Sequence, residues 1–212
     1  MNKLLKYRIL PYSRYGSLYQ ERESYYRSFI TEYDLDFTHH VLTEEHQAPF
    51  VTKTLISPQD IPFGATPRVV ISKTGTPSFE VRDSNDLKDH KILFYHIRLL
   101  QEKVLIQFHF IEDFFYYCQL SFLAFTGKTN ELLADSIRAK YGYPGNIARQ
   151  DQVVIRDTCD NKIVIEQGVY LTVRYVTGDR YPREVLETQI RHNYELAKKT
   201  DKEEIIRLSR IL

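Results

Sequence analysis

The sequence contains no tryptophan, one methionine and only two cysteines. Cys118 and Cys159 are too few for a disulfide framework, and neither belongs to a CxxC metal-binding motif. Neither lies in a motif that is typical of a cysteine nucleophile, so we predict no catalytic residue. Two reduced thiols are what a cytoplasmic protein would carry, and we expect that location.

Long apolar runs and an excess of one charge are also missing. The N-terminal stretch MNKLLKYRIL lacks the apolar core of about 7–15 residues that a secretory signal needs. No run approaches the ~18 apolar residues of a membrane span, so we expect no membrane association. The 29 Lys and Arg balance 28 Asp and Glu, a formal net charge of +1. A nucleic-acid partner is therefore not expected, because such proteins usually carry a clear basic excess.

Aromatic residues are abundant, with 16 Tyr and 12 Phe. Both types are enriched in β-strands and at protein interfaces. The composition, 42% hydrophobic and 27% charged, is otherwise that of an ordinary globular protein. The sequence thus predicts a globular chain rich in strands.

A short phrase occurs twice, as Lys73-Thr74-Gly75-Thr76-Pro77 and as Lys140-Tyr141-Gly142-Tyr143-Pro144. Each copy follows a helical pattern, the first with Thr66 at the N-cap and the second from about Thr129. Glycine suits the left-handed position after a helix, and a proline prevents the helix from resuming. We therefore predict that each phrase ends a helix and precedes a sheet.

Runs of β-type residues follow each phrase, at 91–100, 103–111 and 114–125 and then at 152–157, 162–168 and 169–176. Short polar links between them indicate antiparallel neighbours. The predicted fold class is α+β, with two tandem helix-plus-antiparallel-meander units and flanking N- and C-terminal helices. Two helical pieces are expected in the C-terminal tail, the second starting at a capping box at Thr200. The predicted division is 1–60 (N-terminal helix and connector), 61–126 (first unit), 127–178 (second unit) and 179–212 (C-terminal helices).

The pairing of the first two long strands depends on their turn. A two-residue turn at 101–102 predicts Ile97 opposite Ile106 and Phe94 opposite His109. The register of 114–125 stays open, because a bulge would exchange Tyr116 for Tyr117. One face of this sheet then mixes aromatic, basic and amide side chains, which is typical of a recognition surface. The predicted partner-binding residues are Phe94, His96, Arg98, Gln107, His109, Tyr116 and Tyr117. The alternative is that a terminal helix covers this face.

Two other motifs are partly similar to a metal site and to a phosphate-binding loop. The segment 39–46 gathers His39, His40, Glu44 and His46, which could bind a metal, although it matches neither HExxH nor HxxEH. The stretch LAFTGKT, 123–129, has a P-loop outline but lacks the first glycine, so we interpret it as an ordinary turn between a strand and a helix. No cofactor is predicted.

Gly64-Ala65-Thr66, Val70 and Gly75-Thr76-Pro77 resemble the opening of the SmpA/OmlA (BamE-like) family. That bacterial family places a helical segment before a three-stranded meander, which gives Gly64, Thr66, Gly75, Pro77, Gly142 and Pro144 structural roles here. The chain departs from the family at Thr74, where an apolar residue is usual, and at Glu131, where the second copy would have glycine. It also lacks the family's signal peptide and lipidated cysteine.

Two such units in tandem resemble the architecture of beta-lactamase inhibitory protein, in which helices cover one side of a sheet and the other side grips a partner. The resemblance implies a non-enzymatic protein-interaction module that binds a protein partner through a sheet face or the groove between units. The first alternative is a metal-dependent hydrolase that uses His39–His46. The second is a structural scaffold that associates with itself.

Overall fold

The computed structural model describes residues 22, 24–26, 28–29, 35–44, 49–82, 87–99, 102–124, 126–147, 150–168 and 170–209. The chain divides into two compact units, Met1–Glu32 and Tyr33–Leu212. In the first unit residues 24–26 are helical, and most of the N-terminal helix predicted there lies outside the described residues. The second unit holds the sheet and the remaining helices.

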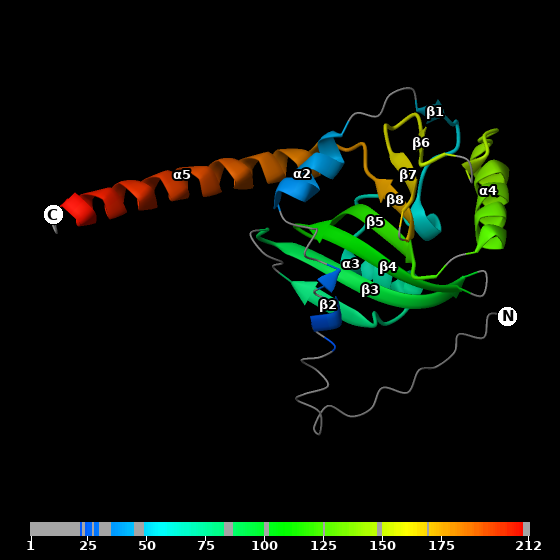
Figure 1. The fold of residues 1–212 in the computed structure, drawn as a ribbon, viewed down its shortest axis with the longest axis horizontal. Coiled ribbons are helices and arrows are strands. Elements are labelled where there is room, and N and C mark those ends of the chain that lie inside the picture. The colour runs from blue at the N-terminus through cyan, green and yellow to red at the C-terminus, as the bar shows by residue number, and fades with distance from the viewer. Residues whose placement is uncertain are drawn as a thin grey trace, which may run out of the picture. The chain divides into compact units, whose positions relative to one another are not determined.

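An eight-stranded sheet forms the centre of the second unit (Figure 1). Its spatial order is β1-β6-β7-β8-β5-β4-β3-β2. All neighbouring strands are antiparallel except β1 and β6, which are parallel. The strands are β1 (Phe50–Val51), β2 (Phe79–Arg82), β3 (His90–Leu99), β4 (Glu102–Ile111), β5 (Phe114–Phe122), β6 (Gln152–Arg156), β7 (Lys162–Gln167) and β8 (Leu171–Val176).

The predicted α+β class and the antiparallel strands are confirmed, but the strands join in one sheet. The meanders β3–β5 and β6–β8 meet where β5 pairs with β8. The helices are α2 (Leu35–Thr43), α3 (Pro67–Thr74), α4 (Gly127–Tyr141) and α5 (Tyr181–Ser209), with a 3-10 turn at Pro58–Asp60. The prediction of two C-terminal helices was wrong. After Pro182 the segment has neither glycine nor proline, and a threonine inside a helix costs only a few tenths of a kcal/mol, so α5 continues through Thr200.

The repeated phrase ends a helix both times, as predicted. Gly75 after α3 has φ 89° and Gly142 after α4 has φ 72°, a region that favours glycine. Thr66 precedes α3, but its side chain makes no capping hydrogen bond. Gly64 has φ 82°, and a Cβ there would lie 3.2 Å from the Phe114 ring.

The stretch LAFTGKT is a turn between β5 and α4. The helix begins at Gly127, and the Thr126 hydroxyl accepts a hydrogen bond from the Thr129 amide. Both observations agree with the interpretation of this motif as an ordinary strand-to-helix connection.

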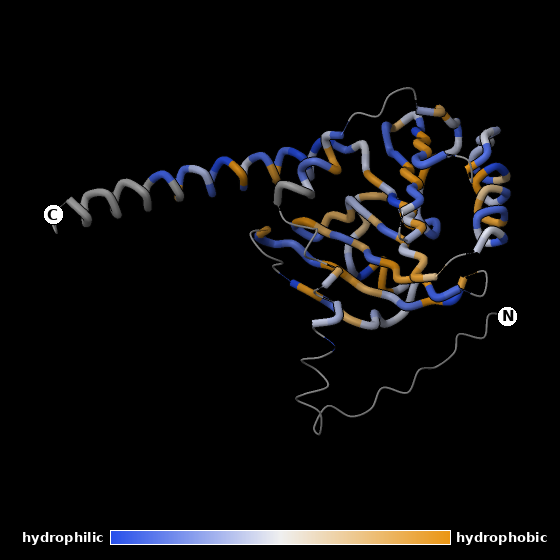
Figure 2. Tube along the Cα trace, viewed as in Figure 1, coloured by the Kyte–Doolittle hydropathy of each residue, from blue (hydrophilic) through white to orange (hydrophobic). Residues whose placement is uncertain are grey.

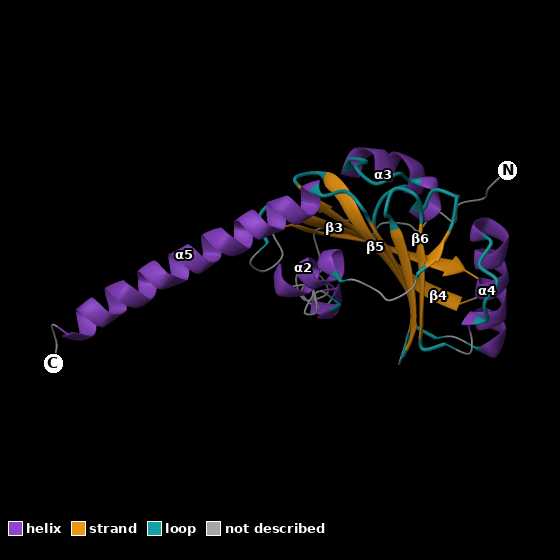
Figure 3. Cartoon of the chain, turned by 90° about the horizontal axis from the view of Figure 1, so that it is seen from above, coloured by secondary structure: helices purple, strands orange, loops and turns teal. Residues whose placement is uncertain are grey.

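The core lies on the sheet face that α3 and α4 cover (Figure 3). Alternate residues of each long strand point into it, as the period of two requires. Figure 2 shows hydrophobic residues concentrated in the strands. The sheet contributes to this core Leu93, Tyr95, Val104, Ile106, Phe108, Phe110, Phe115, Cys118, Phe122, Val153, Ile155, Ile163, Ile165, Leu171 and Val173. The same alternation places on the opposite face apolar side chains such as Phe94 and Leu105 together with polar ones such as Gln107 and Arg174.

The β3–β4 register differs from the prediction. Ile97 lies opposite Val104, and Phe94 lies opposite Gln107. Leu99 pairs with Glu102, so the link is 100–101, one position earlier than expected. The error of two residues conserves the parity of the strand, and the predicted division into faces therefore holds.

A β-bulge resolves the register of β5. The ladder shifts between His109 and Phe110, so that Tyr117 pairs with His109 and Phe115 pairs with Phe110. Tyr116 is the additional residue at this point.

Within the part of the chain that the structure describes, no helix is both long enough and apolar enough to cross a membrane.

Candidate functional site

The seven residues predicted to bind a partner divide into buried and exposed groups. His96 and Arg98, near the end of β3, are exposed. The other five are at most 2% exposed: Phe94, Gln107, His109, Tyr116 and Tyr117. Helix α2 lies on this side of the sheet, opposite α3 and α4 (Figure 3).

The buried members belong to a hydrogen-bonded network that sequence reasoning found only in part. His90 Nε2 lies 3.1 Å from the Tyr116 hydroxyl and 3.3 Å from His109 Nδ1. His109 Nε2 in turn lies 3.4 Å from Gln107 Oε1. His90 was missed because the predicted strand began one residue later, although it shares the alternation of His96. The network links strands β3, β4 and β5 through buried side chains on one face of the sheet.

Burial keeps this network uncharged. Desolvation lowers the pKa of His90 to about 3 and lowers the pKa of His109 well below its usual range. Desolvation also raises the pKa of Tyr116. Neutral imidazoles that are at most 1% exposed serve as hydrogen-bonding partners within the fold.

The β5–β8 half of this face is more accessible. We call it the polar sheet face and define it by the residues that the strand registers place together: Gln119, Gln152, Arg156, Lys162, Glu166, Thr172 and Arg174. All seven are intermediate in exposure or exposed. Glu166 pairs with Arg174 and accepts a hydrogen bond of 2.7 Å from Gln152 Nε2.

Two arginines of the polar sheet face each have a side-chain N–H donor that lacks a hydrogen-bond acceptor. The Nε atoms of Arg156 and Arg174 are buried and have no hydrogen-bond partner. The Arg174 side chain is 13% exposed and the Arg156 side chain 34%. A buried donor that lacks an acceptor costs about 1–3 kcal/mol, so each of these groups calls for an explanation.

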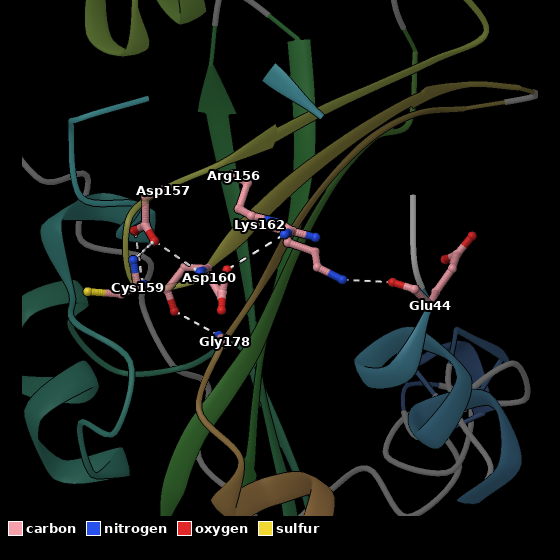
Figure 4. Close-up of polar contacts among 8 residues, drawn as sticks. Glu44, Arg156, Asp157, Cys159, Asp160, Lys162 and Gly178 are labelled. Carbon is pink, nitrogen blue, oxygen red and sulfur yellow. Dashed lines mark hydrogen bonds and ion pairs between the residues drawn. The ribbon is translucent and has the colours of Figure 1, made fainter. Parts of the chain in front are cut away.

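Asp157 fixes the end of the strand that carries Arg156 (Figure 4). Its buried carboxylate accepts from the Ile56 amide at 2.7 Å and from the Cys159 amide at 2.8 Å. It also accepts from the Asn161 amide and from Asn161 Nδ2, both at 3.0 Å. One side chain therefore shapes the β6–β7 turn and ties it to residue 56, far away in the sequence.

The neighbouring contacts leave little freedom at this turn. Asn161 Oδ1 accepts from the Gly178 amide at 2.9 Å, and Lys162 Nζ donates to the Glu44 carbonyl at 2.7 Å (Figure 4). A Cβ at Gly178 would lie only 2.2 Å from the carbonyl oxygen of Cys159. The short polar link between the predicted strands at 152–157 and 162–168 indicated a turn here, but the sequence gave no sign that Asp157 is buried.

The alternative metal site is only partly described. His39, His40 and Glu44 lie in or just after α2, and His46 lies outside the described residues. Among the residues that are described, no three His, Cys, Asp or Glu side chains are grouped to hold a metal ion. Cys118 is buried with a raised pKa, caused by desolvation, and Cys159 is exposed.

Searches of this chain against protein-family models, curated proteins and solved structures found no match.

Proposed function

We propose that this chain is a protein-interaction module that binds its partner through the polar sheet face. The opposite face of the same strands is filled by the apolar core under α3 and α4. Side chains that are charged and partly exposed, on a rigid sheet, match the composition of recognition surfaces that rely on a few well-placed groups.

The observation that carries the proposal is the pair of unsatisfied guanidinium donors at Arg156 and Arg174. Arginine is enriched among the residues that dominate binding energy, and it donates hydrogen bonds but accepts none. Partner acceptors that reach these guanidinium groups, after a change of side-chain rotamer, would remove the cost of the unfilled donors. His96 and Arg98 on β3 are the exposed members of the surface predicted from the sequence. In this proposal they form a secondary part of the binding surface, beside the polar sheet face.

The tandem arrangement and the SmpA/OmlA resemblance belong to the same proposal. Helix α3 precedes the meander β3–β5 and α4 precedes the meander β6–β8. Both helices end at a glycine with positive φ, and the third strands of the two meanders pair with each other. This order supports two related units that share one sheet, with β2 as an addition in the first unit.

Partner capture from the native host tests the surface. The tagged wild-type chain is compared with the double variant Arg156→Ala/Arg174→Ala by quantitative mass spectrometry, and the captured protein is then purified and titrated against both. We expect at least about tenfold weaker binding for the double variant. Arg138→Ala is the matched control, because Arg138 is an exposed arginine on α4 that pairs with Asp135. Equal affinity of the folded double variant and the wild type would refute the proposed surface.

A further inference from the structure

We infer that Asp160 competes with the partner: its carboxylate pairs with the Arg156 guanidinium in the unbound chain and is displaced when the partner binds. This inference rests on the proposed function and adds a regulatory contact to the same surface. It starts from the two carboxylates that lie against the two arginines, Asp160 at Arg156 and Glu166 at Arg174.

Glu166 is held in place from two sides. It pairs with Arg174 on β8 and accepts a hydrogen bond of 2.7 Å from Gln152 Nε2 on β6. The Glu166 side chain is 35% exposed, and that of Arg174 only 13%. A charged pair that is this enclosed, with a further hydrogen bond to the carboxylate, is unfavourable to separate. Glu166 therefore fixes the orientation of the Arg174 guanidinium.

The contact between Asp160 and Arg156 has the opposite character (Figure 4). Asp160 Oδ1 lies 3.7 Å from Arg156 Nη1, which is too far for a hydrogen bond. The Asp160 side chain is 73% exposed, and water and salt weaken an ion pair in such a position. A hydrogen-bond acceptor on the partner can therefore replace Asp160 with little loss of free energy.

The backbone that carries Asp160 is fixed, so the competition involves its side chain alone. The Asp157 amide donates to the Asn161 carbonyl at 2.9 Å, and the Asp160 amide donates to the Asp157 carbonyl at 3.2 Å. Asp160 also packs closely against Gly178, where a Cβ would lie 2.5 Å from the Asp160 carbonyl carbon. The exposed carboxylate can change its χ1 rotamer without moving the strands.

The two carboxylates should therefore have opposite effects on partner binding. The pair between Asp160 and Arg156 has to open before the partner can occupy that guanidinium, and the free energy of opening reduces the apparent affinity. Glu166 supports binding instead, because it orients Arg174. Both residues remove one negative charge when they are replaced by their amides, so a difference in sign separates these roles from a general charge effect.

Two probes test the competition. The first is acetate, a minimal hydrogen-bond acceptor, with binding followed by the Nε–H NMR signal of Arg156. The second is the protein captured by the wild-type chain, purified and titrated by calorimetry. Asp160→Asn should bind both probes about two- to fivefold more tightly than the wild type, the range for an exposed ion pair.

Three further variants complete the test with the captured protein. Glu166→Gln should bind it at least about twofold more weakly. Asp160→Asn in the Arg156→Ala background should change the affinity less than about 1.5-fold, since the competing carboxylate has lost its target. Asp135→Asn is the matched control on α4, where Asp135 pairs with Arg138, and should have an equally small effect. Circular dichroism verifies that each variant is folded.

The inference is overturned if Asp160→Asn leaves both affinities unchanged or weakens either, if acetate shifts the Arg156 signal in neither protein, or if the gain persists in the Arg156→Ala background. An equal gain for Glu166→Gln or Asp135→Asn would also overturn it. The two proposals fail separately. Capture that depends on both arginines, without a gain for Asp160→Asn, removes the competition alone. Capture that is independent of both arginines removes the binding surface itself.

Discussion

Replacement of Asp157 by alanine should destabilise the fold strongly, although the residue lies at a turn. Its carboxylate accepts four hydrogen bonds, from the amides of Ile56, Cys159 and Asn161 and from the Asn161 side chain. A hydrogen bond to a charged group contributes about 1.5–3 kcal/mol. Water can replace the acceptor at the turn, where Cys159 is exposed, but not at the buried Ile56.

We therefore expect a loss of about 3 kcal/mol, close to the value for one or two of these bonds rather than four. For a chain of this size the melting temperature should fall by about 6–12 °C. Urea unfolding followed by circular dichroism measures the free energy directly.

Asp160→Asn in the same turn is the matched control. Asp160 has φ 62°, a conformation that asparagine also tolerates, and its ion pair with Arg156 is exposed. The unfolding free energy of the Asp160→Asn variant should stay within about 0.5 kcal/mol of the wild-type value. A loss below about 1 kcal/mol for Asp157→Ala, or an equal loss for Asp160→Asn, would show that Asp157 does not hold the turn.

Three further predictions follow from the packing and the buried histidines. Gly178→Ala should lose about 1–3 kcal/mol in urea unfolding, because its Cβ would lie 2.2 Å from a backbone oxygen, whereas Gly127→Ala, with open space around it, should be neutral or slightly stabilising. The unfolded chain protonates His90 near pH 6.5, whereas the folded chain protonates it only near pH 3, so the stability that neutral His90 contributes is complete above pH 6.5 and is lost as the pH falls. Between pH 7 and pH 5 the free energy of unfolding should therefore fall by about 2 kcal/mol because of this residue, and His90→Gln should flatten the measured pH dependence by that amount. Deletion of residues 195–212 should leave the melting temperature nearly unchanged, since α5 projects from the sheet with Tyr194 59% and Leu196 50% exposed, and a fall above about 5 °C would contradict this (Figure 1).

Local signals in the sequence were sufficient for much of the fold. Gly75 and Gly142 marked helix ends correctly, because a residue with positive φ is a local requirement. The alternation along β3 and β4 assigned side chains to the right faces even though the predicted register was two residues off. The pairing of β5 with β8 could not be foreseen, since it joins distant segments and has no local signature.

The candidate site was harder to predict for a physical reason. Burial is a tertiary property: the sequence left open whether a terminal helix covers this face, and it could not show that His109 and Gln107 are enclosed while the face continues, partly exposed, to Arg156 and Arg174. Each of these arginines sits in a short strand whose polar positions look like an ordinary solvated edge. Their significance depends on the registers that bring β6, β7 and β8 together.

Amide hydrogen–deuterium exchange on the complex with the captured partner tests the central claim most directly. The account predicts that partner binding slows exchange in 152–156, 162–167 and 171–176, the strands that carry the polar sheet face. Slowed exchange confined to α4 or α5, with these strands unchanged, would contradict it.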